Sequence, residues 1–178
     1  MAVTTDIART WRAPRAVIRR LLDAGQREDR AIAYLLTACL LVFVAQWPRL
    51  RREAYSSDAM PTVMTEEQMT AFLDGWSAFD RLVSYEFLAW LMLWPLILYV
   101  LAALSHLVAK LFGGKGSWYG ARLALFWSLL ATVPLLLLHG LTAGLIGPGP
   151  QTQLIGFLWL GAFAVIWVQT LREAEQAP

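Results

Sequence analysis

Two apolar stretches decide the fold of this chain: FLAWLMLWPLILYVLAALSHLVA (Phe87–Ala109) and LALFWSLLATVPLLLLHGLTAGLI (Leu123–Ile146). Neither contains an Asp, Glu, Lys or Arg residue. At a rise of about 1.5 Å per residue, a helix of either length crosses the ~30 Å hydrocarbon core of a bilayer. An unpaired backbone amide in lipid costs several kcal/mol, so each stretch is predicted to be a membrane-spanning helix. The basic turn Lys110–Ser117 joins the two helices into a hairpin.

Working outward, two further stretches are apolar enough to span a membrane, at residues 31–47 and 154–171. The first is close to the lower length limit for a span. The chain is 58% hydrophobic and 16% charged, which excludes an ordinary soluble domain. Pro95 and Pro134 lie inside predicted helices and should bend them. The sequence therefore predicts an all-α membrane protein with about four transmembrane helices in a kinked bundle, over residues 31–172.

Residues 1–30 are predicted to form a basic amphipathic helix at the membrane interface. Val17, Ile18 and Leu21 recur on one side of a helix that Pro14 would begin and Gly25 would end. Two interpretations stay open: an anchor on an anionic leaflet, or a solvated basic helix that only sets the topology. The predicted lipid or partner contacts, here and in the hairpin turn, are Trp11, Arg12, Arg15, Arg19, Arg20, Lys110 and Lys115.

Two segments outside the spans are polar. Apolar residues at three- and four-residue spacing over residues 64–82, with acidic residues between them, predict an amphipathic connecting helix that is interfacial or re-entrant. Residues 173–178 are predicted to be a polar tail.

The distribution of Lys and Arg predicts the orientation. Four spans place both termini on one side of the membrane, and with both termini in the cytoplasm the cytoplasmic segments contain eleven Lys and Arg residues against four outside. Arg49, Arg51 and Arg52, directly after the first span, are the discordant group.

Candidate chemistry is sparse. The turn Gly113-Gly114-Lys115-Gly116-Ser117 lacks the phosphate-loop pattern, so a tight basic turn between helices is the preferred interpretation. His106 and His139 are polar intramembrane residues, which makes them functional candidates by default. No Asp, Glu or Cys within the spans accompanies either histidine at the spacing of metal ligands, so a structural role is favoured. No catalytic residue, metal or cofactor is predicted.

Two parts of the sequence are informative together: Trp11-Arg12-Ala13-Pro14 before the Val17-Ile18 helix, and the run from Ala102 to Trp118 that continues toward Pro134. On these residues the chain resembles the Yip1 domain of bacterial small membrane proteins. The resemblance implies a multispanning protein of the inner membrane without known catalytic residues. Members of the family often have five spans, whereas four are found here, so residues 64–82 could be the remnant of a fifth. The role of eukaryotic members in vesicle traffic and small-GTPase binding is not carried over to this chain.

Two functional hypotheses follow. The first is a non-enzymatic scaffold or accessory subunit of the bacterial inner membrane, in contact with lipids and with other integral membrane proteins or a second copy of itself. The second is a small transporter or channel that uses His106 and His139. Nothing in the sequence points to nucleic-acid binding.

Overall fold

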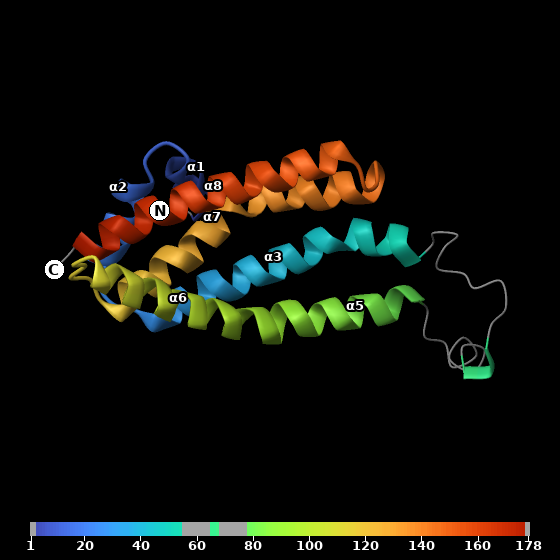
Figure 1. Ribbon diagram of the computed structural model, residues 1–178, viewed down its shortest axis with the longest axis horizontal. Coiled ribbons are helices and arrows are strands. Elements are labelled where there is room, and N and C mark those ends of the chain that lie inside the picture. Colours follow the sequence, from blue (N-terminus) through green and yellow to red (C-terminus); the bar gives the residue numbers. More distant parts are fainter. Residues whose placement is uncertain (1–2, 55–64, 68–77, 177–178) are drawn as a thin grey trace.

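The computed structural model describes residues 3–54, 65–67 and 78–176, and within these residues all regular structure is helical. The short N-terminal helices are α1 (Val3–Thr10) and α2 (Pro14–Asp23). The membrane helices are α3 (Glu28–Ala54), the continuous series α5 (Ala78–Leu88), η2 (Ala89–Leu93) and α6 (Trp94–Leu111), then α7 (Trp118–Leu145) and α8 (Pro150–Gln176) (Figure 1). Four helices in the described residues are long and apolar enough to cross a membrane, which confirms the predicted fold class.

Helix α7 is the centre of the bundle. From Tyr119 to Val133 every side chain except that of Arg122 is buried. A helix that is apolar on all sides is expected to be surrounded by protein or lipid. Here α3 and α8 pack along α7, and α6 packs beside it. The core therefore forms around the first half of α7, with Phe126 and Trp127 fully buried.

The two prolines of the hairpin, both predicted to bend their helices, are accommodated in different ways. Before Pro95, the short π-helix η2 absorbs the irregularity, and Trp94 N–H donates to the carbonyl of Ala89, five residues earlier. Pro134 lies inside α7, and Figure 1 shows α7 changing direction part-way along its length.

Helix α3 is longer than the predicted span of residues 31–47. It has 27 residues and continues through Pro48 to Ala54. Two glycines of α7 let it cross α3 closely. A Cβ added at Gly140 would overlap the backbone oxygen of Ala45, and one added at Gly144 would lie 2.5 Å from the backbone carbonyl carbon of Pro48. The Gly-x-x-x-Gly spacing is therefore used inside the chain to bring two backbones together.

The N-terminal region consists of two helices instead of one. Pro14 occupies the first turn of α2, and Gly25 follows its end with φ +89, as predicted. The apolar side of α2, carried by Val17, Ile18 and Leu21, joins the buried core cluster instead of facing lipid. The predicted connecting helix of residues 64–82 lies mostly outside the described residues, and its last five residues belong to α5.

Candidate functional site

One end of the bundle, called the basic end below, gathers most of the predicted site residues. It holds α1, α2, the turn between α6 and α7, and the C-terminal end of α8 (Figure 1). The predicted polar tail from residue 173 is not a separate tail. Helix α8 continues to Gln176, and Glu173 and Glu175 are 6% and 7% exposed. Because buried carboxylates need hydrogen-bond or charged partners, the contacts of these two residues show how the basic end is held together.

Glu175 is the partner of His106. The distance from His106 Nδ1 to Glu175 Oε1 is 2.6 Å, and the two side chains are 0% and 6% exposed. A carboxylate can only accept hydrogen bonds, so Nδ1 carries the proton of this bond when Glu175 is ionised. The contact ties the C-terminal half of α6 to the last turn of α8. His106 was predicted as a structural intramembrane histidine, but its carboxylate partner, 69 residues away in sequence, was not predicted.

The glycine-rich turn holds the same carboxylate. Gly116 N–H donates to Glu175 Oε2 (3.2 Å), and Lys115 N–H donates to the backbone oxygen of Glu175 (2.9 Å). A Cβ at Gly114 would lie 2.7 Å from Glu175 Oε2, and a Cβ at Gly116 would lie 2.7 Å from Glu175 Cα. The glycines are therefore required by the close approach of α8. The carboxylate that the turn receives belongs to the chain itself.

Aromatic and basic side chains close the other side of the pair. The ring of Trp118 lies 4.5 Å from that of His106, and Lys110 Nζ lies 5.7 Å from the Trp118 ring. His106 Nε2 is buried and has no hydrogen-bond partner among the described residues. Ser105 Oγ donates to Ala102 O (2.8 Å), so its hydroxyl is engaged within its own helix. His106 and Glu175 thus form a closed contact, and the described residues place no nucleophile against them.

The predicted N-terminal arginines divide into two groups. Arg19 pairs with the buried Glu173, and its Nε donates to Glu173 Oε1 at 2.6 Å. Arg20 Nη2 lies 2.5 Å from Asp6 Oδ1. Arg12 and Arg15 are exposed and form no ion pair within the described part of the chain. Two of the four arginines therefore hold α2 to its neighbours, and the other two remain available to lipid or a partner.

Trp11, predicted to contact lipid or a partner, forms a hydrogen bond within the chain. Its Nε1–H donates to the carbonyl of Ala131, in the turn of α7 that precedes Pro134, at 3.1 Å. An internal proline removes one helical hydrogen bond and crowds the carbonyls of the preceding turn. The neighbouring Thr10 accepts a bond from Trp127 Nε1 at 3.0 Å. The N-terminal segment is therefore fixed to the middle of the central helix.

His139 does not join this group. A Cβ at Gly156 of α8 would lie 3.5 Å from its ring, so His139 packs against that glycine. His139 lies 21 residues further along α7 than Trp118, the contact of His106, which corresponds to about 30 Å along the helix. The two predicted histidines thus occupy separate levels of the bundle and share no site.

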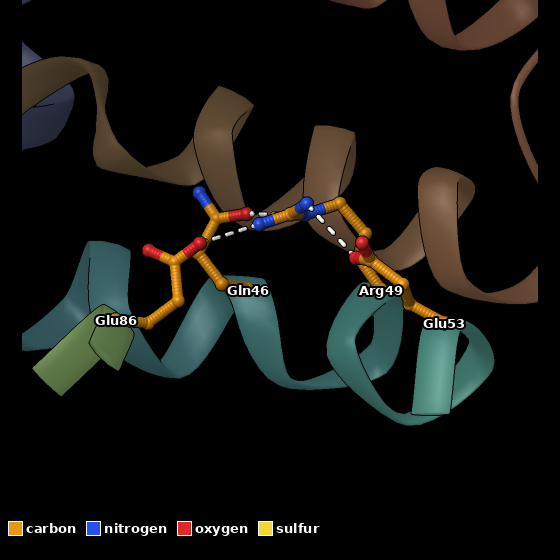
Figure 2. Close-up of polar contacts among 4 residues, drawn as sticks. All are labelled: Gln46, Arg49, Glu53 and Glu86. Atoms are coloured by element: carbon orange, nitrogen blue, oxygen red, sulfur yellow. Dashed lines mark hydrogen bonds and ion pairs between the residues drawn. The ribbon is translucent and has the colours of Figure 1, made fainter. Parts of the chain in front are cut away.

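The discordant arginines at the opposite end have structural partners. Figure 2 shows Arg49 between Gln46 and Glu53 of α3 and Glu86 of α5, with a distance of 2.6 Å from Arg49 Nη2 to Glu86 Oε1. Arg52 Nη1 donates to the carbonyls of Gly144 (3.2 Å) and Leu145 (3.3 Å) at the end of α7. Both residues therefore join helices, which is a structural reason for arginines at this end of the bundle.

The described residues contain no group of three or more His, Cys, Asp or Glu side chains that could hold a metal ion. The Yip1 domain family matches residues 8–177, nearly the whole chain. Neither the curated proteins nor the solved structures contain a significant match. On its helical membrane architecture and this match, the chain belongs to the Yip1 domain family.

Proposed function

We propose that the protein is a non-enzymatic scaffold or accessory subunit of the bacterial inner membrane, and that it packs against another membrane protein through the outward face of α8. The observation that carries this proposal is Gly161. Gly120, Gly140, Gly144 and Gly156 each face other parts of the chain within 4 Å, whereas a Cβ at Gly161 would meet nothing within 4 Å.

A glycine inside a helix needs a reason. In water it costs about 1 kcal/mol relative to alanine, and inside membranes small residues are enriched where two helices approach closely. The other glycines of α7 and α8 have such a neighbour within the chain. Only 11% of the apolar window of α8 is buried, against 67% for α7. A helix of another protein that packs across Gly161 would supply the missing neighbour.

The orientation that we propose places both termini in the cytoplasm. The basic end carries eleven of the fifteen Lys and Arg residues, and cytoplasmic segments of membrane proteins are enriched in these residues. Fusion of the C-terminus to alkaline phosphatase, active only outside the cytoplasm, and to green fluorescent protein tests this directly. We expect the green fluorescent protein fusion to be fluorescent and the alkaline phosphatase fusion to be inactive. The reverse result would overturn the orientation.

The scaffold role is tested by purification in mild detergent from the native membrane, with mass spectrometry of the proteins that comigrate. We expect a stoichiometric partner with the wild type and its loss with Gly161→Leu. Ala33→Leu is the matched control, because Ala33 is exposed on α3 and the substitution adds bulk to a different helix. A wild-type protein that purifies alone, or a partner that is retained by Gly161→Leu, would contradict the proposal.

A further inference from the structure

Two adjoining cavities lie between α6 and α8 at the basic end. Both helices pack on α7 instead of on each other, which leaves a crevice between them. The outer cavity, of about 630 Å³, is lined by the turn glycines Gly113 and Gly114 and by Arg172 and Glu175. The inner cavity, of about 350 Å³, is lined by apolar side chains and Ser105. Ala109 and Leu171 line both, so the two cavities adjoin.

The inner cavity has the character of a channel for a hydrocarbon chain. It runs along residues 101–109 of α6 and 167–171 of α8, one to three turns deeper in the bundle than the outer cavity. Leu104, Val108 and Val168 on its rim are 53%, 52% and 42% exposed, so it opens sideways, toward the lipid. Ser105 contributes no free hydroxyl, because its Oγ donates to Ala102 O.

The outer cavity contains one basic side chain, that of Arg172. Arg172 is exposed and makes no ion pair with the described residues. The one acidic lining residue, Glu175, is already engaged by His106 and by Gly116 N–H. An anionic group beside Arg172 would therefore meet a cation that makes no ion pair with the described residues, and a carboxylate that is already held by two contacts.

We propose that this crevice binds one anionic phospholipid, with its phosphate at Arg172 beside the Gly113-Gly114 turn and one acyl chain between α6 and α8. The occupant follows from the order of the two cavities. A cavity lined by Arg172 and Gln176 at the end of the helices adjoins an apolar cavity nearer the middle of α6 and α8, which is the order of charged and apolar groups in a phospholipid. This inference goes beyond the proposed scaffold role and requires no protein partner.

The test uses the full-length protein in detergent micelles, supplemented with phosphatidylglycerol or phosphatidylcholine and analysed by native mass spectrometry. We expect one phosphatidylglycerol molecule to be retained at a collision energy that removes phosphatidylcholine. Arg172→Gln should lower the retained fraction about fivefold, since a basic side chain near an anionic lipid contributes about that factor. Ala109→Leu, at the junction of the two cavities, should fill the space for the acyl chain and abolish retention of phosphatidylglycerol.

Two matched controls accompany these variants. Arg27→Gln removes an exposed charge at the same end of the bundle, and Arg27 lines neither cavity. Ala33→Leu makes the same change of side chain as Ala109→Leu, but on the exposed surface of α3. Both should retain phosphatidylglycerol as the wild type does. Equal retention of the two lipids, or unchanged retention in Arg172→Gln, would overturn the proposal. A lipid-free dimer that Ala109→Leu dissociates would also overturn it, because the crevice would then be an interface between copies. Since Arg172 is exposed, its variant tests headgroup binding even if Ala109→Leu fails to fold.

Discussion

His106 Nδ1 lies 2.6 Å from Glu175 Oε1, with both side chains withdrawn from solvent, and this contact connects α6 to the end of α8. The two helices otherwise pack on α7. The turn between α6 and α7 adds two backbone N–H donors to the same glutamate. Three separate segments of the chain therefore meet at one carboxylate.

Removal of either partner of this pair should be strongly destabilising. Glu175→Leu leaves the His106 ring buried without a partner, and His106→Leu leaves a buried carboxylate with fewer donors. The loss of one member of a buried pair costs about 3–5 kcal/mol. The free energy of unfolding, measured by SDS titration in mixed micelles with circular dichroism, should fall by this amount in each variant. The double variant should cost clearly less than the sum, and strictly additive effects would show that the two residues are not coupled.

Gly140→Ala and Gly161→Ala should have opposite effects on stability, because only Gly140 lies where α7 crosses α3 closely. Gly140→Ala places a methyl group against the Ala45 carbonyl and should cost about 1–3 kcal/mol through overpacking. Gly161→Ala places its methyl in open space, so stability should stay the same or rise by up to about 1 kcal/mol. The same SDS titration compares them. Equal destabilisation by the two alanines would mean that the Gly140 crossing is not tight.

The contact of the N-terminal segment with α7 depends on the indole N–H of Trp11. Trp11→Phe keeps an aromatic ring and removes the bond to Ala131 O, which should cost about 0.5–1.5 kcal/mol. Limited proteolysis in detergent should then cleave the chain sooner near α1 and α2. Trp47→Phe is the matched control, since Trp47 is 45% exposed against 44% for Trp11 and its ring packs edge-on against Phe43 of its own helix. Equal cleavage of the wild type and Trp11→Phe would show that the bond does not hold the segment.

The ion pair at the opposite end should contribute much less than the buried pair. The side chains of Arg49 and Glu86 are 38% and 25% exposed, and partly exposed ion pairs typically contribute about 0–1 kcal/mol. Arg49→Gln should therefore lower the free energy of unfolding by no more than about 1 kcal/mol. The difference from wild type should shrink further at high salt, because exposed charges are screened. A salt-independent loss of several kcal/mol would show instead that Arg49 acts as a buried charge.

The sequence predicted the helices because lipid leaves an apolar chain few alternatives. Phe87–Ala109 and Leu123–Ile146 must satisfy their own backbone groups, and both are helical. Pro14 and Gly25 predicted the limits of α2 correctly. The fixed φ of proline suits the first turn of a helix, and glycine readily adopts the positive φ that follows a helix end. The glycine turn was placed correctly between α6 and α7, but the reason for its glycines was not visible in the sequence.

Only the tertiary structure decided which surfaces meet. In a soluble protein the apolar side of a helix points to the core, but each membrane helix here is apolar on most sides, so periodicity could not identify α7 as the centre. Nor could spacing pair His106 with Glu175, because the two are joined by the folding of α6, α7 and α8 across 69 residues. The sequence by itself determined that the chain enters the membrane as helices, since the cost of unpaired backbone groups in lipid is local to each segment. The tertiary structure alone determined which helices bring buried polar side chains together, since that depends on the packing of distant segments.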